Sequence, residues 1–328
     1  MKEILLFTCA NSMFREPLAK YGYRVREFPA TFGASEAGDL PPPGDTECAV
    51  VEVDTENPRA SKSLVDALLS REIMVVSVAP RVTDDAKRFL VDSGIADLIA
   101  VDETALKAAC LDAILRNDGP PTGSVLLLED HPPFRRIMGS IARRFSFTAA
   151  AVGRADEFFD ELARHTYSMA FINLGAQGFD LSAFIRNACG AGSFKSTPLV
   201  PYKDMSRGVF VHEFTTGLNR IAKVILTPEE AFNFLLQVLY RMAVFPLVGK
   251  MSESVGFDLL PSFGSDPLPR IYHSMGADIF TLENALGEDR GRSLGATVEA
   301  LRMYALRAEG LRWLARERPG GPTCGPGV

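Results

Sequence analysis

The sequence predicts an α/β protein with two doubly wound parallel-sheet domains in tandem and a C-terminal helical extension. Three observations predict this class. Short β-branched runs alternate with helical patterns over residues 1–116, the same alternation restarts after a glycine- and proline-rich break, and an amphipathic pattern follows near the end. The 328 residues also exceed one typical domain of roughly 100 to 200 residues.

The first half is predicted to run from residue 1 to 117. Its strands are expected at residues 3–7, 23–27, 48–53, 74–78 and 97–101, and its best helices at 61–70, 84–93 and 103–116. Residues 31–46 contain three consecutive prolines and several glycines, so any helix between the second and third strands should be short or frayed.

A linker is predicted at residues 118–123, within a Gly/Pro breaker, and the second domain at residues 124–244. Strands are expected at residues 124–128, 147–151, 169–172, 198–202 and 223–226, and helices at 133–144, 156–164, 181–188 and 229–242. The two halves therefore form an internal structural repeat.

The remaining residues divide into three predicted parts. Residues 245–269 are rich in Gly and Pro and predict an irregular connector, residues 270–317 a helical extension, and residues 318–328 a flexible tail. Within the extension, apolar residues recur at steps of three and four from Leu294 to Leu311, which is typical of an amphipathic helix.

Composition and charge exclude several classes of protein. Hydrophobic residues make up 47% and charged residues 23%, which excludes a disordered or low-complexity chain. The net charge of −6 speaks against wholesale nucleic-acid binding, and it is concentrated in residues 1–118, which carry 13 basic and 20 acidic residues. Five scattered cysteines without CxxC spacing predict reduced thiols in a cytoplasmic protein.

No membrane insertion or secretion is expected. The apolar run after Met1 is too short for a signal peptide core followed by a cleavage site. The most apolar later stretch, residues 231–248, contains Asn233, Gln237 and Arg241 and falls short of the about 20 apolar residues of a membrane span.

Polar residues follow the predicted strands at the edge where doubly wound sheets place their working groups. In the first half, strand three is followed by Asp54, and Pro58 comes four residues later. In the second half, Glu129 and Asp130 follow strand one, and Asn173 follows strand three.

At these positions both halves resemble the receiver domain of two-component response regulators, over residues 1 to about 244. That family carries an acidic pair after strand one, a phosphate-accepting aspartate after strand three, Ser or Thr after strand four, and Lys-Pro after strand five. The resemblance implies a flavodoxin-like (βα)5 fold for each half. It also implies phosphoryl transfer to a carboxylate, assisted by Mg²⁺ held by acidic oxygens.

The first half keeps only part of this site. Asp54 stands at the phosphoacceptor position, and residues 93–97, Ser-Gly-Ile-Ala-Asp, are similar to the family's Gly-Ala-x-Asp-Tyr. Thr8 and Cys9 stand where the metal-binding acids belong, and Val101 stands where the lysine belongs. Without the metal-binding acids and the lysine, phosphoryl transfer to Asp54 would lack most of its electrostatic stabilisation, so phosphorylation of Asp54 is disfavoured.

The hydroxyl position of the first half depends on the register of strand four. Either Ser77 or Val78 occupies it, and the sequence leaves both open.

The second half departs from the family in the complementary way, and we interpret it as a pseudo-receiver. Asn173 replaces the nucleophile, Tyr202 the hydroxyl and Thr227 the lysine. For Glu129 and Asp130 two interpretations stay open: weak binding of a cation such as Mg²⁺, or solvated carboxylates with no cofactor. The small number of oxygen ligands favours the second.

The helix predicted at residues 229–242 is apolar nearly all round, so something must cover its outer face. One alternative is a partner or a homodimer, since the last helix of the family's fold is a usual interaction surface. The other is cover by residues 245–268 or by the tail helix. The candidate interface residues are Phe232, Leu235, Leu236, Leu239 and Tyr240.

These observations favour a non-enzymatic signalling adaptor or scaffold that acts through protein–protein contacts. Its expected partners are signalling proteins such as a histidine kinase or another receiver; nucleic acid is not expected, because no recognition helix is evident. The first alternative is a response regulator that accepts phosphate on Asp54. A second alternative, a two-domain α/β transferase, is disfavoured because neither half has a phosphate-binding glycine loop.

Overall fold

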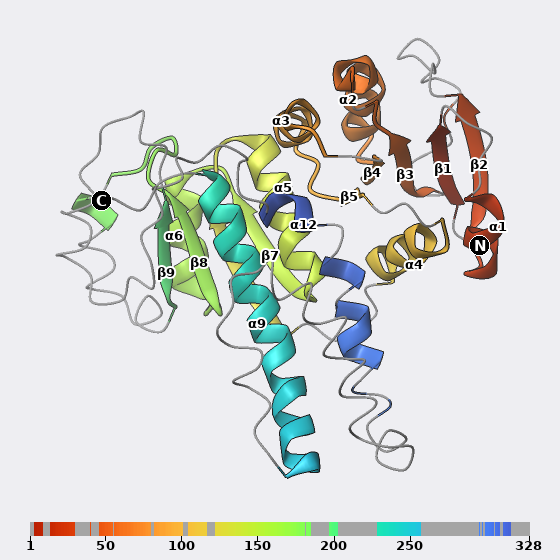
Figure 1. Ribbon diagram of the computed structural model, residues 1–328. Coiled ribbons are helices and arrows are strands. Elements are labelled where there is room, and N and C mark those ends of the chain that lie inside the picture. The colour runs from red at the N-terminus through yellow and green to blue at the C-terminus, as the bar shows by residue number, and fades with distance from the viewer. Residues whose placement is uncertain are drawn as a thin grey trace, which may run out of the picture.

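The computed structural model contains two parallel sheets, which confirms the predicted fold class (Figure 1). The structure describes residues 3–8, 14–29, 40, 46–54, 56–79, 82–100, 104–116, 122–180, 182–184, 197–202, 228–256, 295, 297, 299–304, 306–308 and 311–315.

The first sheet has the strand order β2-β1-β3-β4-β5, and every neighbouring pair is parallel. This order is that of flavodoxin-like doubly wound folds. The strands are β1 (Glu3–Thr8), β2 (Arg24–Pro29), β3 (Thr46–Glu52), β4 (Val75–Val78) and β5 (Leu98–Ile99). The connecting helices are α1 (Arg15–Lys20), the short 3-10 helix η3 (Pro58–Ser61), α2 (Lys62–Ser70), α3 (Asp84–Ser93) and α4 (Thr104–Leu115).

The second sheet repeats this order as β7-β6-β8-β9, again with parallel pairs. Its strands are β6 (Gly123–Leu128), β7 (Phe147–Val152), β8 (Met169–Asn173) and β9 (Leu199–Tyr202), with helices α5 (Pro132–Arg144), α6 (Ala155–Arg164) and α9 (Pro228–Val255). The fifth strand predicted at residues 223–226 lies outside the described residues.

Alternation along the strands gives each sheet two apolar faces. In the first domain, Leu5 and Val51 face α2 and α3, while Ile4 and Val50 face α1 and α4. In the second domain, Leu127 belongs to the face covered by α5 and α9. The faces towards α3 and towards α5 belong to one continuous buried cluster, so the two domains share a core.

The joint between the domains is formed by the end of α3 and by α5. Gly94 ends α3 with φ 76°, and a Cβ there would lie 2.7 Å from Cα of Pro133 and 2.8 Å from Nε of Arg136. Only glycine tolerates both the left-handed backbone and this close approach. Nη2 of Arg136 donates to the carbonyl of Ser93 over 3.0 Å.

A buried ion pair closes the joint. Nε of Arg144 donates to Oδ1 of Asp97 over 2.9 Å, and the two side chains are 2% and 3% exposed. Residues 93–97, which resemble a receiver motif in the sequence, therefore lie at the domain joint.

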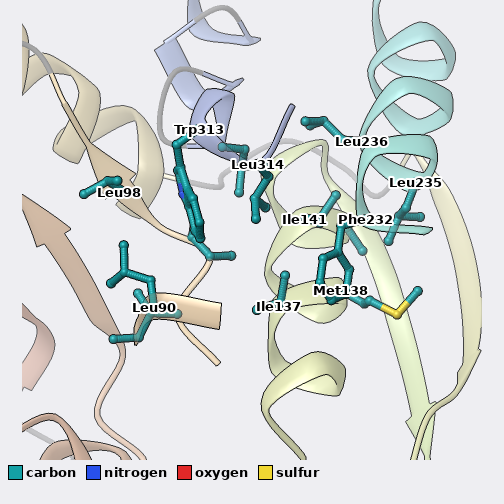
Figure 2. Close-up of a cluster of buried hydrophobic side chains, with 14 of the residues drawn as sticks. Leu90, Leu98, Ile137, Met138, Ile141, Phe232, Leu235, Leu236, Trp313 and Leu314 are labelled. Atoms are coloured by element: carbon teal, nitrogen blue, oxygen red, sulfur yellow. The ribbon is translucent and has the colours of Figure 1, made fainter. Parts of the chain in front are cut away.

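The C-terminal segment packs over this joint. Trp313 and Leu314, from α12 (Arg312–Ala315), lie between Leu90 and Leu98 of the first domain and Ile137 and Ile141 of α5 (Figure 2). The predicted amphipathic pattern agrees at Leu301, Ala308 and Leu311, which are buried; Leu294, Val298 and Ala305 lie outside the described side chains.

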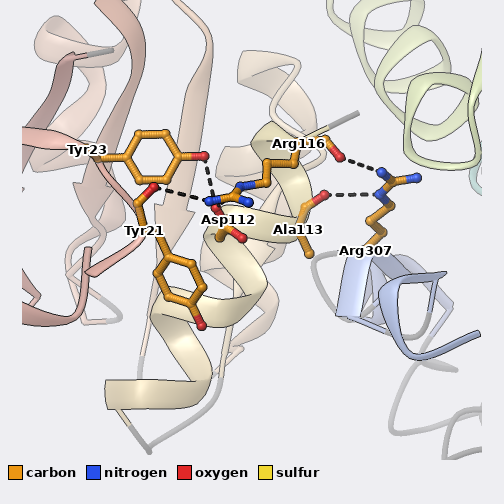
Figure 3. Close-up of polar contacts among 6 residues, drawn as sticks. All are labelled: Tyr21, Tyr23, Asp112, Ala113, Arg116 and Arg307. Atoms are coloured by element: carbon orange, nitrogen blue, oxygen red, sulfur yellow. Dashed lines mark hydrogen bonds and ion pairs between the residues drawn. The ribbon is translucent and has the colours of Figure 1, made fainter. Parts of the chain in front are cut away.

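Arg307, in the helical extension, contacts both domains. Its guanidinium donates to the carbonyls of Ala113 (3.0 Å) and Arg116 (Figure 3). It also donates to Oγ of Ser146 over 3.2 Å. The two carbonyls lie at the C-terminal end of α4, where a cation also complements the helix dipole. Arg116 in turn pairs with Asp112 over 2.7 Å, and Asp112 accepts the Tyr23 hydroxyl over 3.1 Å (Figure 3).

Helix α9 differs from the prediction. It was expected to end at Met242, before an irregular connector from residue 245, but it continues to Val255 with Pro246 inside it. Val248 and Met251 are fully buried, and this burial outweighs the hydrogen bond that proline removes. Residues 234–253 are also long and apolar enough to cross a bilayer, with mean hydropathy 1.3, a test that buried core helices also pass.

Candidate functional site

The candidate site of the second domain lies at the carboxyl ends of β6, β8 and β9. Parallel strands place these ends at one edge of the sheet, so residues distant in sequence meet there. The register puts Asn173 opposite Tyr202, and Leu128, just before Glu129, opposite Ile172. Glu129, Asp130, Asn173 and Tyr202 are therefore brought together, as the sequence predicts.

The side-chain amide of Asn173 lies between the two carboxylates. Its Nδ2 donates to Oε1 of Glu129 over 3.2 Å and to Oδ1 of Asp130 over 3.3 Å. Oδ1 of Asn173 accepts from the backbone N–H of Gly175 over 2.9 Å, which determines which end of the amide faces the acids. An N–H donor thus fills the position between the acids where the resemblance would place a cation.

The two carboxylates accept further hydrogen bonds. The Tyr202 hydroxyl donates to Oε2 of Glu129 over 2.5 Å, and the backbone N–H of His131 donates to Oε1 over 2.8 Å. Oδ2 of Asp130 accepts from the backbone N–H of Gln177 over 3.2 Å. A divalent cation placed between the two acids would have to displace the N–H group of Asn173. Among the described residues, no group of three or more His, Cys, Asp or Glu side chains could hold a metal.

Burial controls the electrostatics of this network. Glu129 is 1% exposed, and burial raises its pKa, although the hydrogen bonds from Tyr202, His131 and Asn173 act in the opposite direction. Burial also raises the pKa of Tyr202 well above 10, with the charge of Glu129 as the next cause. The phenol therefore stays protonated and donates to the acid.

The first domain presents Asp54 differently. Asp54 is exposed just after β3, and its Oδ1 accepts from the backbone N–H of Glu56 over 2.9 Å. Thr8 ends β1, and its neighbour Phe7 is opposite Val51. In this register Thr8 comes opposite Glu52, two residues before Asp54 along the neighbouring strand. Cys9 and Val101 lie outside the described residues, as does Thr227 of the second domain.

The register also answers the open question of Ser77 and Val78. Val78 is opposite Glu52, so both residues lie within β4, before the level of Asp54. Ser77 is fully buried and its hydroxyl has no hydrogen-bond partner among the described residues. Neither residue offers a hydroxyl beside Asp54.

The candidate interface of α9 lies inside the chain. Its residues are at most 2% exposed and belong to the shared core that also contains Trp313 and Leu314: Phe232, Leu235, Leu236, Leu239 and Tyr240. The face is thus covered by the chain's own residues, one of the two alternatives from the sequence.

Sequence reasoning did not identify the joint residues Arg144, Arg307 and Trp313. The chain contains a single tryptophan, and its place within the predicted helical extension could have signalled a packing role. The partners of the arginines are distant in sequence and carry no local pattern.

No family model matches the chain, and no curated protein matches it either. Among solved structures it is similar to a putative two-component system response regulator/GGDEF domain protein, at 14% identity and a TM-score of 0.37 over 73% of this chain and 99% of that one. It is also similar to a probable two-component system response regulator/GGDEF domain protein, at 16% identity and a TM-score of 0.36 over 73% of this chain and 99% of that one. The third similar structure is full-length ShkA in complex with AMPPNP, at 16% identity and a TM-score of 0.29 over 74% of this chain and 50% of that one. The order of the strands, and not these likenesses, defines the fold.

Proposed function

We propose that the chain is a cytoplasmic, non-catalytic signal-transduction adaptor built from two degenerate receiver-like domains. The observation that carries this proposal is the Asn173 amide between Glu129 and Asp130. An amide is no nucleophile for phosphoryl transfer, and its N–H group donates hydrogen bonds to both acids. We therefore expect the second domain to act without phosphate and without Mg²⁺.

The buried joint supports the same proposal. The buried Asp97–Arg144 pair and the Arg307 contacts hold the two domains as one unit. Such a unit presents its outer surfaces in a constant relative orientation, as a scaffold requires. Its partners are other signalling proteins, such as a histidine kinase or another receiver.

A second candidate function is favoured by Asp54 alone. This carboxylate is exposed at the strand end, where a phosphodonor can reach it. The chain would then be a response regulator whose first domain accepts phosphate, with the second domain and tail as its output.

Incubation with Mg²⁺ and acetyl phosphate, followed by intact-mass analysis, distinguishes the two functions. The adaptor proposal expects no phosphoryl adduct on the wild type or on Asp54→Ala. An acid-labile adduct that Asp54→Ala abolishes would establish the regulator instead.

Partner capture tests the adaptor directly. The immobilised chain is exposed to purified histidine kinases and receiver domains, with wild type and Asp54→Ala compared side by side. Equal capture of one of these proteins by both variants is expected. Capture that needs phosphorylated Asp54, or a chain that binds none of them and stays a monomer in sedimentation, contradicts the proposal.

A further inference from the structure

We infer that the first domain carries a binding site for a phosphate group of a small molecule, in the cavity between α1 and β2. This cavity has a volume of about 670 Å³ and lies at the outer edge of the first sheet. It is separated from the domain joint by the width of the sheet, since β5 lies at the opposite edge (Figure 1). Its ligand is independent of the adaptor function proposed above.

Three arginines and one acid line the cavity. Arg15 comes from α1, and Arg24 and Arg26 come from β2, where a spacing of two residues puts them on the same side of the strand. Glu3 is the single acidic residue of the lining, and its Oε1 is 3.7 Å from Nε of Arg24. The lining therefore has a net charge of +2.

This charge runs against the composition of its surroundings. Residues 1–118 carry 13 basic and 20 acidic residues, so an acidic domain gathers three of its arginines at one place. Mutual repulsion makes such a gathering unfavourable unless an anion or solvent offsets it.

A second cavity in the same domain provides the comparison. It has a volume of about 520 Å³ and lies between η3 and α3. Its charged lining residues balance, with three bases and three acids: Arg59, Lys62, Arg88, Glu56, Asp85 and Asp92. Of these two cavities in the described part of the first domain, only the one beside β2 has an excess of positive charge.

The side chains around the arginines suit an anion. Arg26 lies over the Phe28 ring at 5.4 Å, a contact that limits the freedom of its guanidinium. Tyr23, in the cavity wall, donates to Asp112, and burial with the charge of Asp112 raises the pKa of Tyr23 to about 12. The phenol therefore stays neutral and does not repel an anion.

The charge identifies the ligand class. A phosphate monoester carries a charge of roughly −1.5 to −2 near neutral pH, which matches the net +2, whereas one carboxylate supplies only half of it. Guanidinium groups also match the geometry of phosphate oxygens and bind them with paired hydrogen bonds. The cavity volume leaves room for the body of a small phosphate ester.

Isothermal titration calorimetry at constant ionic strength tests this site on the full chain. The probes are inorganic phosphate, for the bare anion, and phenyl phosphate, for an ester whose body enters the cavity. We expect saturable binding of one molecule per chain for at least one probe. The absence of saturable binding by either probe would overturn the inference.

The variants separate the site from general charge effects. Arg24→Gln and Arg26→Gln should each weaken binding about tenfold, and Glu3→Gln should strengthen it several-fold because it removes the only acid. Arg88→Gln, in the balanced cavity, is the matched control and should leave binding unchanged. Equal weakening by Arg88→Gln, or no strengthening by Glu3→Gln, would contradict the site. The Arg24 side chain is 75% exposed, so its replacement leaves the fold intact.

Discussion

The indole Nε1 of Trp313 donates a hydrogen bond of 2.8 Å to the carbonyl of Ala96, 217 residues earlier in the chain. This contact joins the C-terminal segment to the loop between α3 and β5 of the first domain. Trp313 is 2% exposed and packs beside Leu314 and Leu98 in the shared core (Figure 2). The segment that contains Trp313 is therefore an integral part of the two-domain unit.

Replacement of Trp313 should destabilise the whole chain. Trp313→Ala removes a large buried side chain and should lower the free energy of unfolding by about 3–5 kcal/mol. Trp313→Phe keeps most of the ring and loses the hydrogen bond to Ala96, so it should cost less than Trp313→Ala. Urea unfolding followed by circular dichroism measures both, because each variant lacks the only tryptophan. Equal stability of Trp313→Ala and wild type would show that the segment around Trp313 does not hold the joint.

The Asp97–Arg144 pair should be strongly coupled. Burial lowers the pKa of Arg144 and the charge of Asp97 opposes this effect, so loss of Asp97 leaves a buried cation without its counter-ion. Asp97→Ala should cost about 3–5 kcal/mol of unfolding free energy. The double variant Asp97→Leu with Arg144→Leu should cost less than Asp97→Ala. Additive losses in a double-mutant cycle would refute the coupling.

Asn173→Asp should convert the second domain into a metal-dependent one. The new carboxylate removes the N–H donor and adds a third negative charge beside Glu129 and Asp130, so stability without metal should fall by about 1–3 kcal/mol. Mg²⁺ should raise the melting temperature of this variant and leave that of the wild type unchanged. Asn173→Ala is the control, which should lose stability without rescue by Mg²⁺. A wild type that Mg²⁺ stabilises equally would disprove the role of the amide.

Glu129 should make stability depend on pH. Because burial raises its pKa above the ordinary 4.5, the folded chain keeps this proton at pH values where the unfolded chain has lost it. The contribution of Glu129 to the unfolding free energy should therefore fall as the pH rises from about 4.5 through the folded-state pKa, and then level off.

Glu129→Gln should remove this contribution. Urea unfolding at a series of pH values from about 4.5 to 7 measures the difference between variant and wild type, which should change with the predicted sign. Glu157→Gln, at an exposed position on α6, is the control. Parallel stability curves for wild type and Glu129→Gln would rule out a raised pKa.

Much of the candidate site could be predicted from the sequence. Glu129, Asp130, Asn173 and Tyr202 each follow or end a predicted strand, and parallel sheets place such residues at one edge. The sequence left open whether Glu129 and Asp130 bind a cation or are solvated carboxylates. The hydrogen bond from the Asn173 amide depends on which way the side chain points, and the Gly175 N–H determines that. The position of Asp54 relative to Ser77 likewise depends on how β3 and β4 are paired. The alternation of apolar and polar residues in the sequence does not establish this register.

The sequence by itself determined the two-domain α/β repeat, because period-two and helical patterns are local and survive without knowledge of the partners. Only the tertiary structure decided what covers α9, how far α9 extends beyond Pro246, and that residues 93–97 form a joint. These features depend on contacts such as Arg307 with Ser146 and Trp313 with Ala96, which join residues more than 150 positions apart. Burial at such contacts is a property of the whole fold, and no local pattern encodes it.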